Sequence, residues 1–550
     1  MTLKEWIRKK VLGIVGLARD DSPDRDRTTF INDSERLMKT RVAEYNVWYH
    51  GDGDELLNFY TQKNLFEFNT EPYYSRNKRN YFWSISATES DIKRTHSGQP
   101  RNIVDTLVMI TKFPNISIED VTEDEILCSI LKDCRLKQIY KNQQLPLTLI
   151  EGWGCYKINF DKDISDYPYP MYYRANNVDF VVKGGRVISA IFKDYYTNGN
   201  NVNYLLIETR TLKYDAVQDI RYLEIQKELF TTDRSGEFVN KVEIEDYKNV
   251  PELAGMTKDD LLIIIDNMDS LLAVPCILFE NTSGSGEYGR SIFTGKIDLF
   301  DDLDQCLSQA SNTVRRSTTT EYFNTDFLER DAKTGMPVQP KAFDRKYVFY
   351  KGQIGSDGES TGKEPVQVTQ PAVNFEQYSD QAIKILMQIL NGVMSPATLG
   401  IDIAKKDNAE AQREKEKVTI FTRNAIIDTE TDILREVCCE LLKAYEFMHA
   451  GKITKSDYDI TIKFSEFADD SYEAKLEVLG SAFDQELISE EMFMDKLYGD
   501  TLSRAEYQKE LAWLKENHTK PRVDGMKGAF TGEMTPQPNE EEAEFGNEEL

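Results

Sequence analysis

The 550-residue chain has little of what metal sites and nucleophilic active sites need. Its four histidines include no His-x-x-x-His spacing, and its seven cysteines include no Cys-x-x-Cys pair. A structural zinc site is therefore not expected. No Ser-His-Asp or Cys-His set can be assembled from so few histidines, and an odd number of cysteines is typical of free thiols in a reducing cytoplasm.

The chain also lacks a run of 18 apolar residues, so no transmembrane helix is expected. Basic residues precede the apolar run 11–18, as they do in an export signal. The apolar residues of this region also share one helix face, namely Leu3, Ile7, Val11, Ile14 and Ala18. We expect an amphipathic helix here, with an export signal or a peripheral membrane helix as the alternatives.

Basic residues are also too few to balance the acidic ones, 67 against 94, so the formal net charge is −27. Proteins that grip DNA tightly neutralise its phosphates with lysine and arginine, whereas most of this surface should repel a duplex. An ordinary acidic protein is the simplest interpretation. With 40% hydrophobic and 11% aromatic residues, the chain should form several globular domains with a large buried core.

Two glycine-rich segments imitate nucleotide-binding loops without the surroundings that such loops need. Gly284 to Gly289 matches Gly-x-Gly-x-x-Gly, but no βαβ unit surrounds it and the helix that follows is crowded with aspartates, which repel phosphate. Gly358 to Lys363 resembles a P-loop, but its first glycine is one residue late and Glu364 replaces the Ser or Thr that holds magnesium. We expect neither NAD nor ATP to bind.

The first half of the chain changes from a helical to a strand-like pattern near residue 151. Residues 31–149 look mostly helical, and residues 151–247 look like a β-meander. Within it, Val178–Val182 and Val187–Phe192 flank Lys183-Gly184-Gly185-Arg186, a hairpin signal. The type of the buried segment 261–265 is not decided by its pattern.

The second half gives helix, strand-rich insert, helix, short loop and long helix, in that order. Apolar residues recur at steps of three or four from Ile297 to Val314, and again from Tyr378 to Val393. Short strands are expected at 347–350 and 365–368. A helix of about 35 to 40 residues should begin near Asn408, followed by a strand at 459–464 and by two or three polar helices to about residue 517.

Acidic residues mark two further places. Asp298, Asp301, Asp302 and Asp304 open the helix from Ile297, where a solvated helix face is the preferred interpretation and a metal site the alternative. After Gly532 the chain carries seven glutamates and no basic residue, so we expect a disordered tail.

The order of these parts resembles a phage portal protein, the head-to-tail connector of long-tailed phages, in the subfamily typical of Gram-positive hosts. The resemblance rests on 296–305 with Ser308, Gln309 and Asn312; on 370–378 and 392–400; on Asn408-Ala409-Glu410 and 415–417; and on 96–105 and 487–489. It implies an α+β fold, a mostly helical ring subunit with a β-rich wing sheet and a small β-containing clip. The implied parts are a wing at 1–290, a first stem helix at 291–316, a clip at 317–371, a second stem helix at 372–393, a tunnel loop at 394–408, a long helix with a wing return at 409–465, a crown at 466–530 and the acidic tail at 531–550.

The resemblance also implies a function without chemistry of its own and without a cofactor. Portal proteins form a dodecameric ring at one capsid vertex, assembled in the host cytoplasm and kept in the virion, through which double-stranded DNA is packaged and ejected. The implied partners are other copies of the chain, duplex DNA, the terminase large subunit, head-tail adaptors, and the major capsid and scaffolding proteins. A different virion structural protein, such as a tail component, and a nucleotide-dependent enzyme remain the alternatives.

Two groups of candidate site residues follow from the resemblance. The tunnel loop would present Ser395, Pro396, Thr398, Leu399, Gly400, Lys405, Lys406 and Asn408. The stem would use Asp298, Asp301, Asp302, Asp304, Arg315, Arg316, Ile385 and Leu386. We expect Lys405 and Lys406 to touch DNA phosphates, with a solvated helix start as the alternative, and Ile385 and Leu386 to pack on a neighbouring subunit.

Overall fold

The computed structural model describes most of the chain between residues 35 and 518. The described residues are 35–61, 81–84, 92–162, 164–198, 202–216, 219–232, 238–280, 288–317, 319–324, 330–336, 338, 345–350, 366–369, 375–401, 416–451, 453, 455, 457–465, 476, 479–483, 487–498 and 504–518. Contacts divide the chain into two units, Met1–Ser465 and Glu466–Leu550. The expected N-terminal helix, the acidic tail and the loop 358–363 lie outside the described residues.

The N-terminal part of the first unit is helical, as expected. Its helices are α2 (Glu35–His50), α3 (Gly53–Thr61), η1 (Phe82–Ser84), α6 (Gln99–Thr111), α7 (Val121–Asp133), α8 (Leu136–Ile139), the π-helical turn η2 (Tyr140–Gln144) and α9 (Leu145–Glu151). Trp48, Ile103 and Leu107 are buried in one large core, which explains the helical spacing of apolar residues. The short strand β1 (Asn115–Ile118) was not predicted.

Two antiparallel sheets follow. The smaller sheet has the order β10 (Ala273–Ile277), β2 (Trp153–Asn159), β3 (Tyr169–Arg174). The larger sheet has the order β4 (Val178–Lys183), β5 (Arg186–Thr197), β6 (Asn203–Asp215), β7 (Ile220–Thr232), β8 (Phe238–Lys241), with β9 (Leu262–Asp266) also on β7. The predicted hairpin is confirmed, with Gly184 and Gly185 at φ of 60° and 76° in the turn between β4 and β5. Segment 261–265 is resolved as strand β9.

The motif Gly284 to Gly289 lies mostly outside the described residues, but its last glycine has a packing role. Gly289 forms an isolated β-bridge with Glu280, and a Cβ at Gly289 would overlap the carbonyl oxygen of Gly152. Only glycine allows two backbones to approach so closely.

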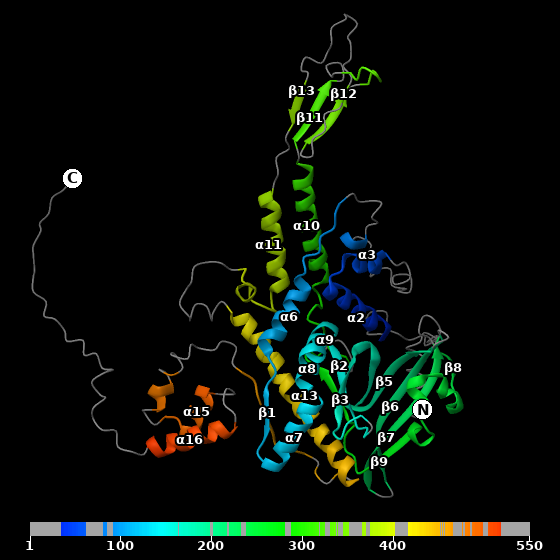
Figure 1. Cartoon of the computed structure of the whole chain (residues 1–550), viewed down its shortest axis with the longest axis vertical. Helices are drawn as coiled ribbons and strands as arrows, with labels where there is room; N and C mark the ends of the chain where they lie inside the picture. The colour runs from blue at the N-terminus through cyan, green and yellow to red at the C-terminus, as the bar shows by residue number, and fades with distance from the viewer. Residues whose placement is uncertain are drawn as a thin grey trace, which may run out of the picture. The chain divides into compact units, whose positions relative to one another are not determined.

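Helices α10 (Ile297–Arg316) and α11 (Phe375–Leu390) pack side by side, and a small sheet separates them in the sequence (Figure 1). In that sheet β11 (Thr319–Asn324) lies between β12 (Arg345–Tyr350) and β13 (Val366–Thr369), parallel to β12 and antiparallel to β13. The predicted strands β12 and β13 are confirmed. Strand β11 was not predicted, and it begins only three residues after the end of α10.

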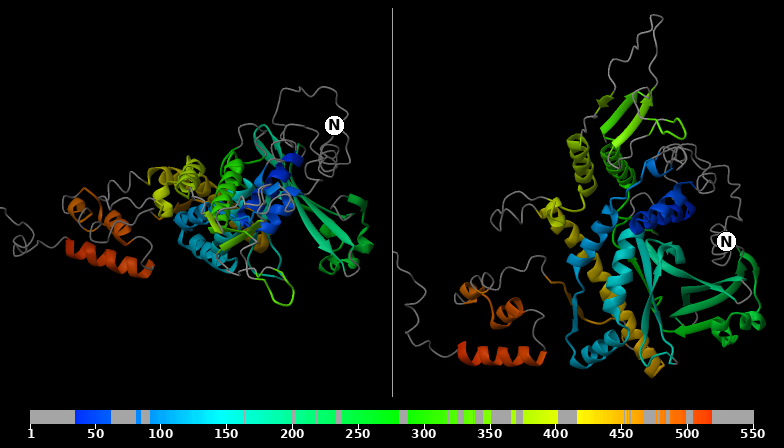
Figure 2. Two further views of the ribbon diagram at one scale, coloured as in Figure 1. Left: turned by 90° about the horizontal axis from the view of Figure 1, so that it is seen from above. Right: turned by 45° about the horizontal axis from the view of Figure 1, so that its top comes forward.

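The long helix α13 (Lys417–Ala450) packs on α6, α7, β2 and β10, and Figure 2 follows its course past these elements. The described helix begins at Lys417, after the N-cap Glu416, and the predicted start near Asn408 lies outside the described residues. The predicted strand after it is β14 (Ile460–Lys463), which pairs antiparallel with β1. The core of the first unit therefore joins residues from both ends of that unit.

The second unit contains two described polar helices, as predicted: α15 (Glu490–Tyr498) and α16 (Arg504–His518). The rings of Phe483 and Phe493 stack with centroids 4.6 Å apart.

In the described part of the chain, no helix combines the length and apolarity needed to cross a bilayer. All seven cysteines are free thiols. Helices and antiparallel sheets together make the fold α+β.

Candidate functional site

Hydrogen bonds join helices α10 and α11 at two places, near the start of α10 and in its middle. The ammonium of Lys296, just before α10, donates to the carbonyl oxygens of Ile389 (2.7 Å) and Asn391 (3.0 Å) at the end of α11. The thiol of Cys306 donates to the carbonyl oxygen of Tyr378 at 3.4 Å. Lys296 thereby places a cation on the unpaired carbonyls of a helix C-terminus, where the helix dipole favours it. The two helices run antiparallel.

The expectation of a solvated aspartate face on α10 is wrong for Asp301 and Asp304. Their exposed fractions are 4% and 0%, whereas Asp298 and Asp302 are exposed. Among the described residues no group of His, Cys, Asp and Glu could hold a metal ion, so the alternative of a metal site finds no support there either. The buried pair instead accepts hydrogen bonds from the N-terminal part of the chain.

The carboxylate of Asp301 accepts two backbone hydrogen bonds, from the N–H of Phe82 (2.7 Å) and of Trp83 (3.3 Å). Burial raises the pKa of Asp301 to about 7, although these two N–H donors act against the shift. One turn earlier, Asp298 accepts from the hydroxyl of Tyr81.

Asp304 also binds this N-terminal part of the chain to α10. Its carboxylate accepts from the indole N–H of Trp83 (3.0 Å) and the backbone N–H of Ser97 (2.8 Å), and it pairs with Nδ1 of His96 (2.7 Å). One turn further on, the hydroxyl of Ser308 accepts from the backbone N–H of Thr95 at 2.9 Å. We call the residues Tyr81–Trp83 and Thr95–Ser97, with Asp301, Asp304 and Ser308, the aspartate buckle.

Sequence reasoning missed the aspartate buckle, although a signal was present. Asp301, Asp304 and Ser308 recur at steps of three and four, so they share one face of α10. The partners of these side chains, Tyr81–Trp83 and Thr95–Ser97, have no periodic pattern of their own. Short polar side chains on one helix face, next to an apolar face, predict hydrogen bonds to a backbone segment that packs there.

The loop after α11 is tied to the start of α13. Gly392 (φ 73°) ends α11, and the 3₁₀ turn η8 (Pro396–Leu399) ends at Gly400 (φ 69°). The hydroxyl of Thr419 accepts from the backbone N–H of Ser395 at 2.8 Å and lies 2.7 Å from the hydroxyl of Thr398. Ser395 is buried, and Pro396, Thr398 and Leu399 are half-buried. Lys405, Lys406 and Asn408 lie outside the described residues.

Helix α11 leaves an apolar surface open in the single chain. Ile383 and Met387, one turn apart, are 46% and 42% exposed, and Phe421 on α13 is 61% exposed. Cavities of about 420 Å³ and 360 Å³ flank Asn391 and Gly392 beside this surface. Ile385 and Leu386 are half-buried and pack against the core of their own chain, and their contact with a neighbouring subunit stays a prediction. At the far end of α10, Arg315 is exposed and Arg316 ends the helix.

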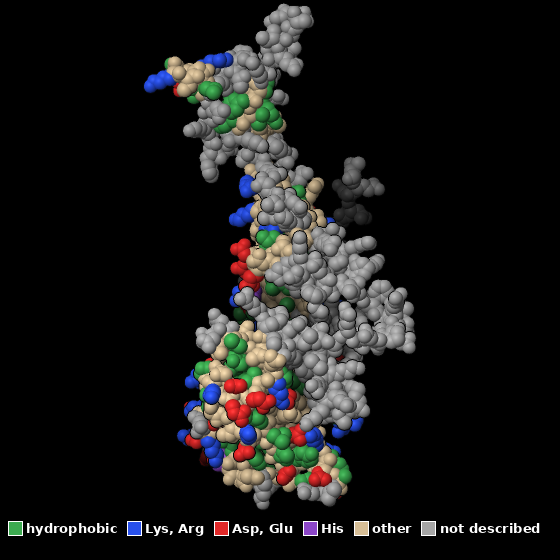
Figure 3. Space-filling view, turned by 90° about the vertical axis from the view of Figure 1, so that its right-hand side faces the viewer, with side chains coloured by type: hydrophobic (Ala, Val, Ile, Leu, Met, Phe, Trp, Pro, Cys, Tyr) green, Lys and Arg blue, Asp and Glu red, His purple; other side chains and the backbone are tan. Residues whose placement is uncertain are grey.

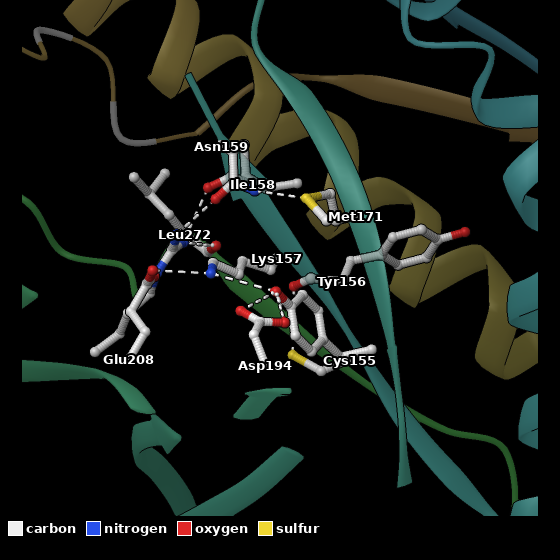
Figure 4. Close-up of polar contacts among 11 residues, drawn as sticks. Cys155, Tyr156, Lys157, Ile158, Asn159, Met171, Asp194, Glu208 and Leu272 are labelled. Carbon is white, nitrogen blue, oxygen red and sulfur yellow. Dashed lines mark hydrogen bonds and ion pairs between the residues drawn. The ribbon is translucent and has the colours of Figure 1, made fainter. Parts of the chain in front are cut away.

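A second group of buried polar residues joins the two antiparallel sheets (Figure 4). Glu208 on β6 accepts from the ammonium of Lys157 on β2 (2.8 Å) and from Nε of Arg210 (2.8 Å). Arg210 also donates to the carbonyl oxygens of Ile158 (2.9 Å) and Leu272 (2.6 Å). Burial alone would raise the pKa of Glu208, but Arg210 and Lys157 lower it to about 2. These charges satisfy one another, so we interpret the group as a cross-link between sheets.

A third buried polar contact lies inside the helical core. The carboxyl of Glu430 on α13 accepts from the amide of Gln144 at 2.7 Å, and its exposed fraction is 0%. Burial raises the pKa of Glu430 to about 8, so the group is mostly neutral at pH 7. Its second oxygen, Oε2, has no hydrogen-bond partner among the described residues.

Comparison with known proteins adds no relative: no family model matches the chain, and no curated protein matches it. Fold and site together define an α+β chain whose two antiparallel helices are connected through a separate three-stranded sheet and flanked by a long core helix.

Proposed function

We propose that the chain is the subunit of a phage portal ring, a channel for double-stranded DNA at one vertex of a capsid. One observation carries the proposal. The chain runs from α10 through a small separate sheet and back along the antiparallel helix α11. The second helix exposes an apolar surface at Ile383 and Met387. A ring subunit needs such a surface, because a neighbouring copy would cover it.

In this proposal α10 and α11 are the stem, the sheet β11–β13 is the clip, and residues 1–290 with α13 and β14 form the wing. Residues 466–530 would be the crown, and 394–408 the tunnel loop. The clip would carry the packaging ATPase, the terminase large subunit, and later the head-tail adaptors. Capsid and scaffolding proteins would surround the wing.

The net negative charge of the chain favours a channel through which DNA slides over a site that binds DNA tightly. Twelve copies at −27 would give a ring of formal charge about −324, which repels a duplex. On the face drawn in Figure 3, acidic and basic side chains are interspersed over the sheet region and do not gather into one basic surface. The chain would act without chemistry or cofactor of its own, and DNA would be moved by the ATPase.

Native mass measurement and negative-stain imaging of the purified protein test the proposal. Twelve copies of 63.4 kDa give a particle of about 760 kDa with a central hole wide enough for B-form DNA. A chain that stays monomeric at micromolar concentration, or one that forms open filaments as tail components do, would overturn it. A thermal shift of several degrees with ATP or NAD at millimolar concentration would instead favour the enzyme alternative.

A further inference from the structure

The faces that α10 and α11 turn toward each other can be assigned residue by residue. On α10, Leu299, Leu303 and Cys306 recur at helical spacing, and Cys306 touches the backbone of Tyr378. On α11, Ala382 and Ile385 share a face with Tyr378 and pack into the same core.

A second row of side chains lies one residue before these facing positions on each helix. The rows are Asp298, Asp302, Gln305 and Gln309 on α10, and Gln377, Gln381, Lys384 and Gln388 on α11. The two aspartates and the α11 row are exposed, and Gln305 and Gln309 are half-buried. A local two-fold axis relates the members of an antiparallel pair, so equivalent positions lie on the same side of the pair. We call these eight residues the glutamine face.

At the level where α10 begins and α11 ends, the opposite side of the pair is buried in the protein core. Phe300 on α10 comes one residue after the facing Leu299 and is 0% exposed, and Leu390 comes one turn after Leu386, on the same side of α11, and is 1% exposed. The glutamine face is therefore the side of the pair that points away from the core of its own chain.

The two rows of the glutamine face are also in register. The contacts of Lys296 with Ile389 and Asn391 place the start of α10 level with the end of α11. Counting along the antiparallel helices from that level sets Asp298 beside Gln388, Asp302 beside Lys384, Gln305 beside Gln381 and Gln309 beside Gln377. The only lysine is thus level with a carboxylate, and amides stand level with amides.

The composition of this face is unusual for the chain. Five of its eight residues are glutamine, although the whole chain has only twenty. Asp298 accepts from Tyr81, and none of the other seven side chains makes a hydrogen bond or ion pair with any residue that the structure describes. Their polar groups remain available to a ligand.

We propose that the glutamine face is the channel wall along which duplex DNA slides. This inference rests on the proposed function and assigns it a surface. Cations hold DNA because each neutralised phosphate releases counterions. Amides exchange hydrogen bonds with phosphates and water without that gain, so no position along the duplex is held strongly. With two aspartates and one lysine the face carries a formal charge of −1 per copy, and the carboxylate level with Lys384 weakens its attraction.

The test places lysines on this face and on a matched surface elsewhere. Gln305→Lys combined with Gln381→Lys adds 24 positive charges to a ring of twelve. The control is Gln508→Lys on the exposed surface of α16. We expect rings of the double variant to bind a 40-base-pair duplex at least tenfold more tightly than wild type at about 0.1 M salt. The gain should disappear as salt rises, and the control should change binding less than twofold.

A second readout follows access to the face directly. With the exposed native thiol removed by Cys128→Ser, Gln381→Cys should gain one adduct of a 5-kDa polyethylene-glycol maleimide over its parent when rings are dissociated and be protected in rings threaded with DNA, whereas Gln508→Cys should gain the adduct in both. Rings that form normally but show equal affinities and no protection would overturn the assignment and leave the portal proposal standing. Loss of ring assembly in the lysine variant would instead make this face a subunit interface. Absence of rings in the wild type would overturn the proposed function itself.

Discussion

At the scale of single residues, Asp304 shows how one buried carboxylate holds distant parts of the chain together. It accepts from an indole and a backbone N–H and pairs with an imidazole, all from residues about 200 positions earlier. Each donor would lose its partner if the carboxylate were removed, and a buried donor without a partner costs about 1–3 kcal/mol.

We therefore expect Asp304→Ala to lower the free energy of unfolding by roughly 2–4 kcal/mol. Chemical denaturation followed by tryptophan fluorescence measures this loss, because Trp83 is part of the contact. The matched control is Asp302→Ala, two residues earlier on the exposed side of α10, which should change stability by less than about 0.5 kcal/mol. Equal losses for the two variants would show that the aspartate buckle contributes no stability.

Glu430 should give the protein a measurable pH dependence. Its pKa is raised by burial from an ordinary value of 4.5 to about 8. The folded state therefore binds a proton that the unfolded state releases, and stability falls as pH rises from about 4.5 to 8.

Glu430→Gln removes this titration and keeps an amide opposite Gln144. The variant should be more stable than wild type at pH 8 by a few kcal/mol, on the order of 3–5 at most, and similar to it at pH 5. Urea denaturation at both pH values measures the difference. A wild-type advantage that grows with pH would contradict the assignment, because it would require an ionised carboxylate stabilised in place.

At the scale of elements, helix α11 separates the side chains that hold its own chain from those left for a partner. Ile385 and Leu386 pack inward, while Ile383 and Met387 are open to solvent. Met387→Asp should therefore prevent assembly without unfolding the monomer. Ile385→Asp should destabilise the stem itself, because it places an unpaired charge on a half-buried side chain that packs against the core.

Size-exclusion chromatography with light scattering, together with thermal melting, distinguishes these two outcomes. We expect Met387→Asp to elute as a monomer whose melting temperature lies within about 2 °C of a wild-type monomer obtained by dilution. Assembled rings of Met387→Asp would show that the exposed face of α11 lies outside the interface.

The elements that sequence could predict are those with a strong local pattern. Helix α10 shows a clear apolar period from Ile297, and the hairpin at Gly184 and Gly185 has turn residues that only one geometry satisfies. Strand β1 was missed because it lies among helices and its partner is more than 300 residues away, and β11 was missed because it follows helix α10 almost directly. The burial of Asp301 and Asp304 was also missed, since their partners are backbone N–H groups of a segment with no pattern of its own.

At the scale of the whole molecule, charge should control how assembled copies behave. At −27 per chain, copies repel one another, so any assembly must overcome that repulsion with apolar contacts. We expect rings to form more completely at 0.5 M than at 0.05 M salt, because salt screens the repulsion more than it weakens apolar contacts. Mass photometry across a salt series tests this. Dissociation at high salt would mean that ion pairs hold the copies together.

The pairing of β1 with β14 also has a consequence for synthesis. Residues 115–118 leave the ribosome long before their partner 460–463 exists, and α13, which packs on α6, β2 and β10, is made only slightly earlier. Through most of translation the N-terminal helices and the first sheet therefore lack one side of their core. Such a chain exposes apolar surface until α13 and β14 have been made, which makes it a client for chaperones and delays self-association until these elements have joined the core.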